Sequence, residues 1–226
     1  MSFVERRQKD IDAFSLTGEL SPRYNEVVRI GLMGGTFDPI HMGHLFIAEE
    51  ARVRYGLQEV IFFPNNQPAH REGKSASADP ETRFALTQLA IESNPHFRIS
   101  RVELDRPGPS YAFDTLHRFR AELGESVELF YIVGADSIND VLTWYRGAEL
   151  FDLCRFIALT RPHFDLEAAR SELSAHQLER VEFLETVGLD IASRELRQRV
   201  RDGLPIRYLT PDVVEREVHR RGLYRE

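Results

Sequence analysis

The sequence predicts an α/β fold in which one mostly parallel sheet is covered by helices on both faces. Short apolar runs alternate with segments of helical period from Arg29 onward. The first apolar run passes through a glycine pair directly into a helical segment. The last helix is expected to start at Thr210-Pro211, where the Thr210 hydroxyl caps it, and to stop at Gly222. Strands joined by helices pair in parallel, because right-handed crossovers place the helices on the two faces of the sheet.

Each expected element follows from its own local pattern. The strands are short runs rich in β-branched, aliphatic and aromatic residues, whereas the helices are longer and carry apolar residues three and four positions apart. The expected strands are residues 28–33, 59–64, 98–104, 127–134, 154–160 and 181–187. The expected helices are residues 43–55, 80–93, 111–123, short ones within 135–151, 166–178, one opened by Ser193, and 211–221. The prediction is a single domain with a Rossmann-like doubly wound parallel sheet and C-terminal helices, which binds ligands at the carboxyl ends of its strands.

Two segments fall outside this alternation. Residues 1–28 are polar and mixed in charge, so we expect an N-terminal extension to a domain of residues 29–226. Within the extension, a short amphipathic helix over residues 3–14 and a frayed terminus both remain open. Residues 64–79 form one long polar loop, which is typical of either a lid or a disordered segment.

Composition limits the classes of partner. With 29 basic and 36 acidic residues the formal charge is -7, so no overall positive field exists to bind a nucleic-acid backbone. A single cysteine, Cys154, excludes an intramolecular disulfide and fits a reducing compartment. No apolar run reaches the ~18 residues that span a membrane, and the first residues lack the apolar centre of a signal peptide. We therefore expect a cytoplasmic protein with no nucleic-acid or membrane partner.

The segment RIGLMGGTFDPIHMGHLFIAEEA carries the clearest chemical signal. Gly34 and Gly35 allow the backbone to approach a ligand closely, and the helix that follows directs its free N–H groups and positive dipole end toward the same place. His41 and His44 are three residues apart at the helix start, a spacing that puts both imidazoles on one side, facing the turn. These donors favour a phosphate site.

This segment resembles the T/G-x-F-D-P-x-H-x-G-H signature of the nucleotidyltransferase superfamily related to class I aminoacyl-tRNA synthetases. The resemblance implies that the histidines bind ATP phosphates and stabilise the transition state while a phosphate oxygen attacks the α-phosphorus in line. No covalent enzyme intermediate is implied, and catalysis consists of preorganised donors facing developing charge. The catalytic residues it implies are His41 and His44, with further ATP contacts from Gly34, Gly35, Thr36 and Phe37.

Four later segments look like nicotinate-nucleotide adenylyltransferase. They are FFPNNQPAHR, GPSYAFDTL, YIVGADSINDVLTWYRGAEL and LPIRYLTPDVVEREVHRRGLY, and with the histidine segment they extend in the family's order from Arg29 to Tyr224. The resemblance implies that nicotinate mononucleotide and ATP react to give deamido-NAD and pyrophosphate, in NAD biosynthesis. Mg²⁺ would be bound through the ATP phosphates. No general base is needed, because the attacking phosphate is already an anion.

The same resemblance implies roles within these segments. Asp136 would meet the adenosine ribose beside Gly134, and Ser193 and Arg197 would bind phosphate in the sequence IASRELR, where the family usually has I-S-S-T-x-I-R. Ser193 is also predicted to cap the helix that it opens, and so to direct free N–H groups at the phosphates. The substrate-binding residues implied for the other nucleotide are His70, Arg71, Tyr111, Trp144 and Tyr145, with the tryptophan stacked on the nicotinate ring.

Several alternatives stay open. Asp136 and Ser193 could be plain helix caps, Tyr111 an ordinary helix-start residue, and His70 and Arg71 part of a surface loop. Ala112 replaces the family's usual threonine, which leaves the selectivity between nicotinate and nicotinamide open. The direction in which the Arg194 side chain points is also open.

The function also has alternatives. The chain could use another acceptor, such as a phosphopantetheine or glycerol phosphate, or it could be a non-catalytic nucleotide-binding module. An aminoacyl-tRNA synthetase is disfavoured, because the chain is short and acidic and lacks a K-M-S-K-S-like segment. Whether the chain forms a homo-oligomer is not indicated by the sequence.

Overall fold

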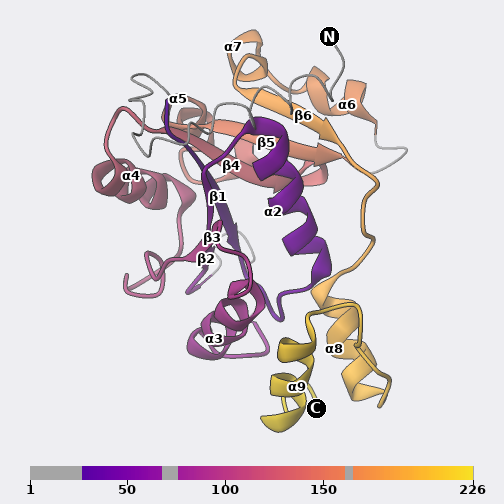
Figure 1. Ribbon diagram of the computed structural model, residues 1–226. Helices are drawn as coiled ribbons and strands as arrows, with labels where there is room; N and C mark the ends of the chain where they lie inside the picture. The colour runs from indigo at the N-terminus through magenta and orange to yellow at the C-terminus, as the bar shows by residue number, and fades with distance from the viewer. Residues whose placement is uncertain (1–26, 68–75, 161–164, 226) are drawn as a thin grey trace, which may run out of the picture.

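The computed structural model describes residues 27–67, 76–160 and 165–225 (Figure 1). Six strands form one sheet in the order β3-β2-β1-β4-β5-β6, and every neighbouring pair is parallel. Their bounds are β1 Arg29–Gly35, β2 Glu59–Pro64, β3 Phe97–Ile99, β4 Glu128–Gly134, β5 Arg155–Thr160 and β6 Val181–Glu185. The order runs outward in both directions from β1 and β4, which makes the gap between their carboxyl ends the point where ligands bind in such sheets.

Helices follow the strands in alternation, as the sequence predicts. The longer ones are α2 Met42–Tyr55, α3 Pro80–Ile91, α4 Ala112–Leu123, α8 Ser193–Arg201 and α9 Asp212–Arg220. The shorter ones are η1 Ala135–Ser137, η2 Asp140–Thr143, η3 Gly147–Glu149, α5 Leu150–Leu153, α6 Leu166–Ser171 and α7 Ala175–Leu178. In Figure 1 the C-terminal pair α8 and α9 lies at the end of the molecule where α2 begins.

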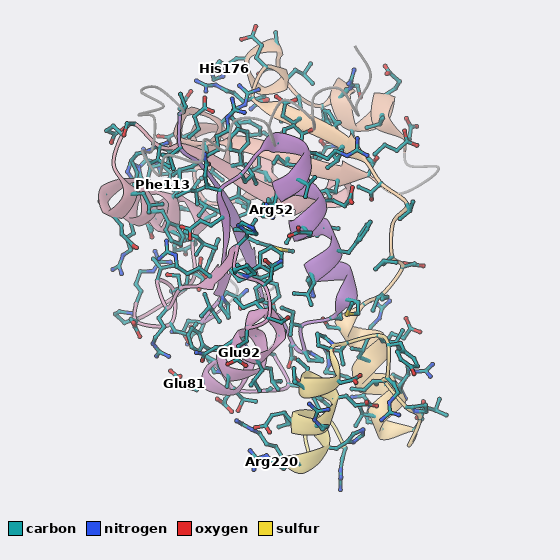
Figure 2. All side chains as sticks on the ribbon, in the orientation of Figure 1. Arg52, Glu81, Glu92, Phe113, His176 and Arg220 are labelled. Atoms are coloured by element: carbon teal, nitrogen blue, oxygen red, sulfur yellow. The ribbon has the colours of Figure 1, made fainter. Side chains whose placement is uncertain are left out.

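The core has two parts, one on each face of the sheet. Alternate strand residues enter different clusters: on β2, Val60 and Phe62 pack with α2, α3, α8 and α9, whereas Ile61 and Phe63 pack with α4, α5 and α6. The exposed residues Glu81 on α3, Glu92 directly after α3 and Arg220 on α9 belong to neither cluster (Figure 2). This arrangement confirms the predicted doubly wound sheet.

The structure corrects two of the predicted elements. The third strand ends at Ile99 rather than at residue 104, because the Ser100 hydroxyl accepts the Val102 N–H at 3.2 Å and turns the chain. The predicted helix over 166–178 is two helices, because Ser174 starts a new one: its hydroxyl accepts the Gln177 N–H, and the Gln177 side chain accepts the Ser174 N–H.

Two predicted helix caps are also wrong. The residues at the N-cap positions of α8 and α9 are Ala192 and Pro211, not Ser193 and Thr210. Thr210 donates its hydroxyl to the Ile40 carbonyl oxygen at 2.8 Å, which ties the α9 end of the chain to the loop before α2.

Two further features bear on the expectations from sequence. The conceivable helix over residues 3–14 lies outside the described residues. Among the described helices, none combines the length and the apolar character that a membrane crossing requires.

Candidate functional site

A cavity of about 1340 Å³ lies at the carboxyl ends of β1, β4 and β5, where the strand order reverses. Its walls come from segments far apart in the sequence: the turn after β1, the first turn of α2, the ends of β4 and β5, and the start of α8. The predicted site residues that line it are Gly34, Gly35, Thr36, Phe37, His41, His44, Tyr111, Gly134, Trp144, Tyr145, Ser193 and Arg197.

Three predicted site residues are not placed by the structure. His70 and Arg71 lie outside the described residues, and the side chain of Asp136 is not described although its backbone forms part of η1.

The two histidines face the cavity as a stacked pair. Their ring centroids are 3.6 Å apart with 24° between the planes. His41 stands at the N-cap of α2, and its backbone N–H donates to Nδ1 of His44 at 3.2 Å. Since Nδ1 accepts, the neutral His44 ring carries its proton on Nε2 and offers that group as a donor.

The electrostatics of the pair favour the neutral form of His44. Burial lowers the pKa of His44 well below its ordinary value, and the proximity of His41 lowers it further. The Phe37 ring meets the His44 ring edge-on at 5.0 Å between centroids, and Phe37 itself is buried. A neutral imidazole held between two rings at a helix start is a fixed hydrogen-bond donor.

Gly34 stands at a point of the cavity wall where a side chain does not fit. A Cβ on Gly34 would lie 2.5 Å from Cε2 of Phe63 and 2.7 Å from the hydroxyl of Tyr131, so a side chain does not fit there. Both Phe63 and Tyr131 are themselves buried in the sheet and cannot easily move aside. The packing of Phe63 and Tyr131 therefore requires glycine at this position in the cavity wall.

The start of α8 lies against the loop that precedes α2. Ser193 donates its hydroxyl to the Pro39 carbonyl oxygen at 2.9 Å, and Arg197 donates through Nη1 to the Asp38 carbonyl oxygen at 2.6 Å. Arg194 is exposed and also lines the cavity. Two arginines and the first turn of a helix thus meet the histidine pair, a combination suited to a polyphosphate.

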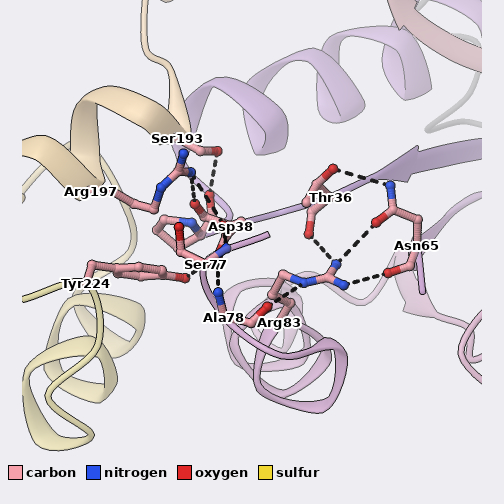
Figure 3. A network of polar contacts seen from close by, with 10 residues as sticks. Thr36, Asp38, Asn65, Ser77, Ala78, Arg83, Ser193, Arg197 and Tyr224 are labelled. Carbon is pink, nitrogen blue, oxygen red and sulfur yellow. Dashed lines mark hydrogen bonds and ion pairs between the residues drawn. The ribbon is translucent and has the colours of Figure 1, made fainter. Parts of the chain in front are cut away.

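Arg83, which the sequence analysis missed, is a buried arginine that connects backbone segments beside the cavity and so forms the cavity floor (Figure 3). Arg83 is 1% exposed and donates to the carbonyl oxygens of Ala78, Thr36 and Asn65 at 3.1, 2.7 and 2.8 Å. It also reaches the Asn65 side chain and the Asn66 carbonyl oxygen, both at 3.3 Å. These bonds join the ends of β1 and β2. The only sequence signal was a charged residue among the apolar positions of the α3 segment.

Aromatic side chains form the other end of the cavity. The rings of Tyr111 and Tyr145 lie 4.7 Å apart at 40°, and the half-buried Trp144 meets Tyr131 at 6.1 Å. Ala112 also lines this end, where it begins α4. The predicted aromatic residues therefore all line the cavity, and Tyr111 and Tyr145 are in ring contact.

Glu103 is a second residue that the sequence analysis missed, because it fell within a run predicted to be a strand. It is buried, lines the cavity, and accepts the Thr115 hydroxyl at 2.8 Å. Burial raises the pKa of the Glu103 carboxyl, although hydrogen bonds from Thr115 and Ser110 oppose the shift.

Comparison with known proteins gives one family. A family model described as cytidylyltransferase-like matches residues 32–184. A relative from Moorella thermoacetica, named "Probable nicotinate-nucleotide adenylyltransferase", is 46% identical over 200 residues, which cover 87% of this chain and 92% of the relative. A relative of the same name from Saccharopolyspora erythraea is 45% identical over 197 residues, covering 87% of this chain and 90% of the relative.

A solved structure shares the fold. Plasmodium falciparum nicotinic acid mononucleotide adenylyltransferase complexed with NaAD superposes with a TM-score of 0.73 at 19% identity. The superposition covers 87% of this chain and 97% of that chain.

Proposed function

The chain belongs to the nicotinate-nucleotide adenylyltransferase family, and from that premise we propose that its cavity joins the phosphate of nicotinate mononucleotide to the adenylyl group of ATP. The products are deamido-NAD and pyrophosphate, so the reaction belongs to NAD biosynthesis. The observation that carries the proposal is the stacked histidine pair, which lines the same cavity as the α8 arginines and the aromatic side chains.

The chemistry is a direct displacement at phosphorus. A phosphate oxygen of nicotinate mononucleotide forms a bond to the α-phosphorus of ATP while the bond from that phosphorus to the bridging oxygen breaks, and pyrophosphate carries away the electron pair. The nucleophile is already an anion, so no side chain has to remove a proton. The work left to the protein is alignment of the two reactants and stabilisation of the charge that develops on the phosphoryl oxygens.

We assign the phosphate end to the residues of the two helix starts. His44 donates through Nε2 to the α-phosphoryl oxygens, and His41 stacks beside it as a second donor. Ser193 and Arg197, on the first turns of α8, face the β- and γ-phosphates. Thr36, Phe37 and the glycine pair Gly34 and Gly35 form the turn over which the phosphates pass.

The remaining proposed contacts divide between the two nucleotides. Gly134 and Asp136 follow β4, where the ribose of ATP would lie. Tyr111, Trp144 and Tyr145 would hold the pyridine ring, since flat apolar faces stack well on an aromatic ring. His70 and Arg71 would meet the phosphate of nicotinate mononucleotide.

We propose that a divalent cation is held at this site through the substrate. Among the described residues no three His, Cys, Asp or Glu side chains gather as a metal site. We propose Mg²⁺ bound through the ATP phosphates, because Mg²⁺ is usually held by phosphate oxygens and water and neutralises their charge. We also propose that residues 29–226 form the catalytic domain with residues 1–28 as an extension. The protein would work in the cytoplasm without a nucleic-acid or membrane partner.

Pyrophosphate release with a panel of acceptors tests the proposed reaction. Nicotinate mononucleotide, phosphopantetheine and glycerol 3-phosphate are each supplied with ATP and Mg²⁺. We expect release with the pyridine nucleotide alone. Turnover with another acceptor in its place would refute the assignment of the aromatic end, and ATP binding without any release would indicate a non-catalytic module.

A further inference from the structure

The carboxylate of Asp38 is the centre of a buried network beside the cavity (Figure 3). Asp38 is 3% exposed. Its side-chain oxygens accept the backbone N–H groups of Ser77 and Ala78 at 2.7 and 3.1 Å and the Tyr224 hydroxyl at 2.8 Å. Nη1 of Arg197 lies 3.5 Å from Oδ2 of the same carboxylate. Four segments of the chain, at residues 38, 77–78, 197 and 224, therefore meet at this carboxylate.

Tyr224 reaches this network from the end of the chain. It is the third-to-last of the 226 residues, and it follows α9. Its side chain is 8% exposed and packs in the same core cluster as α8 and α9, while its backbone adopts a left-handed φ of 62°. That conformation is uncommon for a residue other than glycine. The tyrosine is thus held by the packing of its ring and by the hydrogen bond of its hydroxyl.

The hydroxyl is a permanent donor. Burial raises the pKa of Tyr224 far above its ordinary value, and the charge of Asp38 raises it further. Among the described residues its hydrogen-bond partner is Asp38. Nothing in the reaction proposed above uses this contact.

Arg197 is held by the same aspartate at one corner of its guanidinium. Nη1 donates to the Asp38 carbonyl oxygen and lies near the Asp38 carboxylate. A guanidinium has five N–H donors in a rigid plane, so fixing Nη1 determines where the remaining donors point. Arg197 also lines the cavity. The orientation of its free donors toward a phosphate therefore depends on the position of Asp38.

We propose that Tyr224 is a positioning residue for Arg197: its hydroxyl holds the Asp38 carboxylate, and Asp38 holds the guanidinium at the phosphate end of the cavity. The ligand is the β,γ-phosphate part of ATP, so the inference rests on the proposed function. Without the hydroxyl, the Asp38 carboxylate loses one of its donors and draws Arg197 toward itself. The Arg197 guanidinium then donates weaker hydrogen bonds to the β- and γ-phosphates.

The variant Y224F removes the hydroxyl and keeps the ring that packs in the core. Y208F is the matched control, because Tyr208 is 83% exposed, lies in the loop before α9 and also has a left-handed φ. Calorimetry measures the Kd of a non-hydrolysable ATP analogue and of AMP for each protein. For Y224F we expect the Kd of the analogue to rise about fivefold or more, as for the partial loss of one charge-assisted hydrogen bond from Arg197. The Kd of AMP should change less than about twofold, and Y208F should leave both unchanged.

A double-mutant cycle with R197A separates positioning from a general loosening of the C-terminal end. If Tyr224 acts through Arg197, adding Y224F to R197A leaves the analogue Kd within about twofold of R197A alone. The same fold-change in both backgrounds, or an unchanged analogue Kd for Y224F, would overturn the proposal. If Y224F is partly unfolded at the assay temperature, the cycle is repeated below its melting transition. Because binding is measured without an acceptor, failure of the wild-type protein to release pyrophosphate would refute the proposed function and not this inference.

Discussion

Replacement of Arg83 by methionine should destabilise the protein strongly, because the guanidinium joins the ends of two strands from inside the core. Methionine has similar length and no charge, so it fills much of the space and removes every hydrogen bond. The arginine makes five such bonds to four residues, and three of them are fully buried. The partly buried carbonyl oxygens of Thr36 and Asn66 can regain water. The backbone carbonyl oxygens of Ala78 and Asn65 and the side-chain oxygen of Asn65 cannot.

The magnitude follows from these three buried acceptors. Each buried acceptor left without a donor costs about 1–3 kcal/mol, which gives about 3–9 kcal/mol in total. Part of this cost is offset, because burial of the guanidinium is itself unfavourable: it lowers the pKa of Arg83. The expected net loss is about 3 kcal/mol of unfolding free energy. For a protein of this size that lowers Tm by roughly 6–12 °C.

Urea denaturation of the wild type, R83M and R54M measures this loss. Arg54 is an exposed arginine on α2 with a single loose ion pair of 3.9 Å to Glu50, so R54M should stay within about 0.5 kcal/mol of the wild type. An R83M protein as stable as R54M would show that the Arg83 bonds contribute nothing net. Arg83 would then not stabilise the junction of the β1 and β2 ends.

Four further predictions concern the catalytic end and the aromatic end of the cavity. H44A should lower kcat for pyrophosphate release by about 10²–10³, the usual cost of one preorganised donor, and near-normal turnover would remove His44 from the mechanism. Because the pKa of His44 is lowered in the folded state, only the unfolded chain takes up its proton below about pH 6.5. The melting temperature of the wild type should therefore fall on acidification through that range, and the fall should be smaller for H44Q, in which the glutamine can still accept the His41 N–H; equal slopes would contradict the neutral state of His44. G34A should lower both Tm and ATP affinity, because its Cβ would overlap Phe63 and the Tyr131 hydroxyl. If the variant melts and binds ATP like the wild type, Phe63 and Tyr131 can move aside. A112T should increase the preference for nicotinate over nicotinamide mononucleotide in kcat/KM, and an unchanged ratio would show that this position does not read the pyridine substituent.

The local parts of the fold could be predicted from sequence because their signals lie within single segments. Apolar runs and helical periods gave the order of strands and helices, and the histidine pair was predictable because both residues belong to one helix start. The errors were also local in origin. A serine can turn the chain or begin a helix, and at Ser100 and Ser174 it does so inside segments whose apolar pattern looked continuous.

The tertiary use of polar side chains could not be predicted in this way. Serine and threonine favour N-caps, yet Ser193 and Thr210 donate to carbonyl oxygens 154 and 170 positions away, at Pro39 and Ile40. Both bonds hold the loop before α2. The Tyr224–Asp38 bond joins residues 186 positions apart, and no periodicity relates them.

The roles of the site residues depend on the same kind of long-range geometry. Sequence could indicate that Arg197 and the histidines belong to phosphate motifs, but not that Asp38 would hold the arginine. Glu103 was hidden because an acidic residue at the end of an apparent strand has no motif of its own. The structure places it in the cavity wall near Tyr111 and Ala112.

The most direct test is a steady-state comparison of nicotinate and nicotinamide mononucleotide, each with ATP and Mg²⁺, in which dinucleotide and pyrophosphate are both quantified. Equal amounts of the two products should form, with kcat/KM higher for nicotinate by roughly 10–100-fold, the value of one or two charge-assisted hydrogen bonds to its carboxylate. If neither nucleotide yields a dinucleotide although ATP binds, the cavity does not perform adenylyl transfer to a pyridine nucleotide.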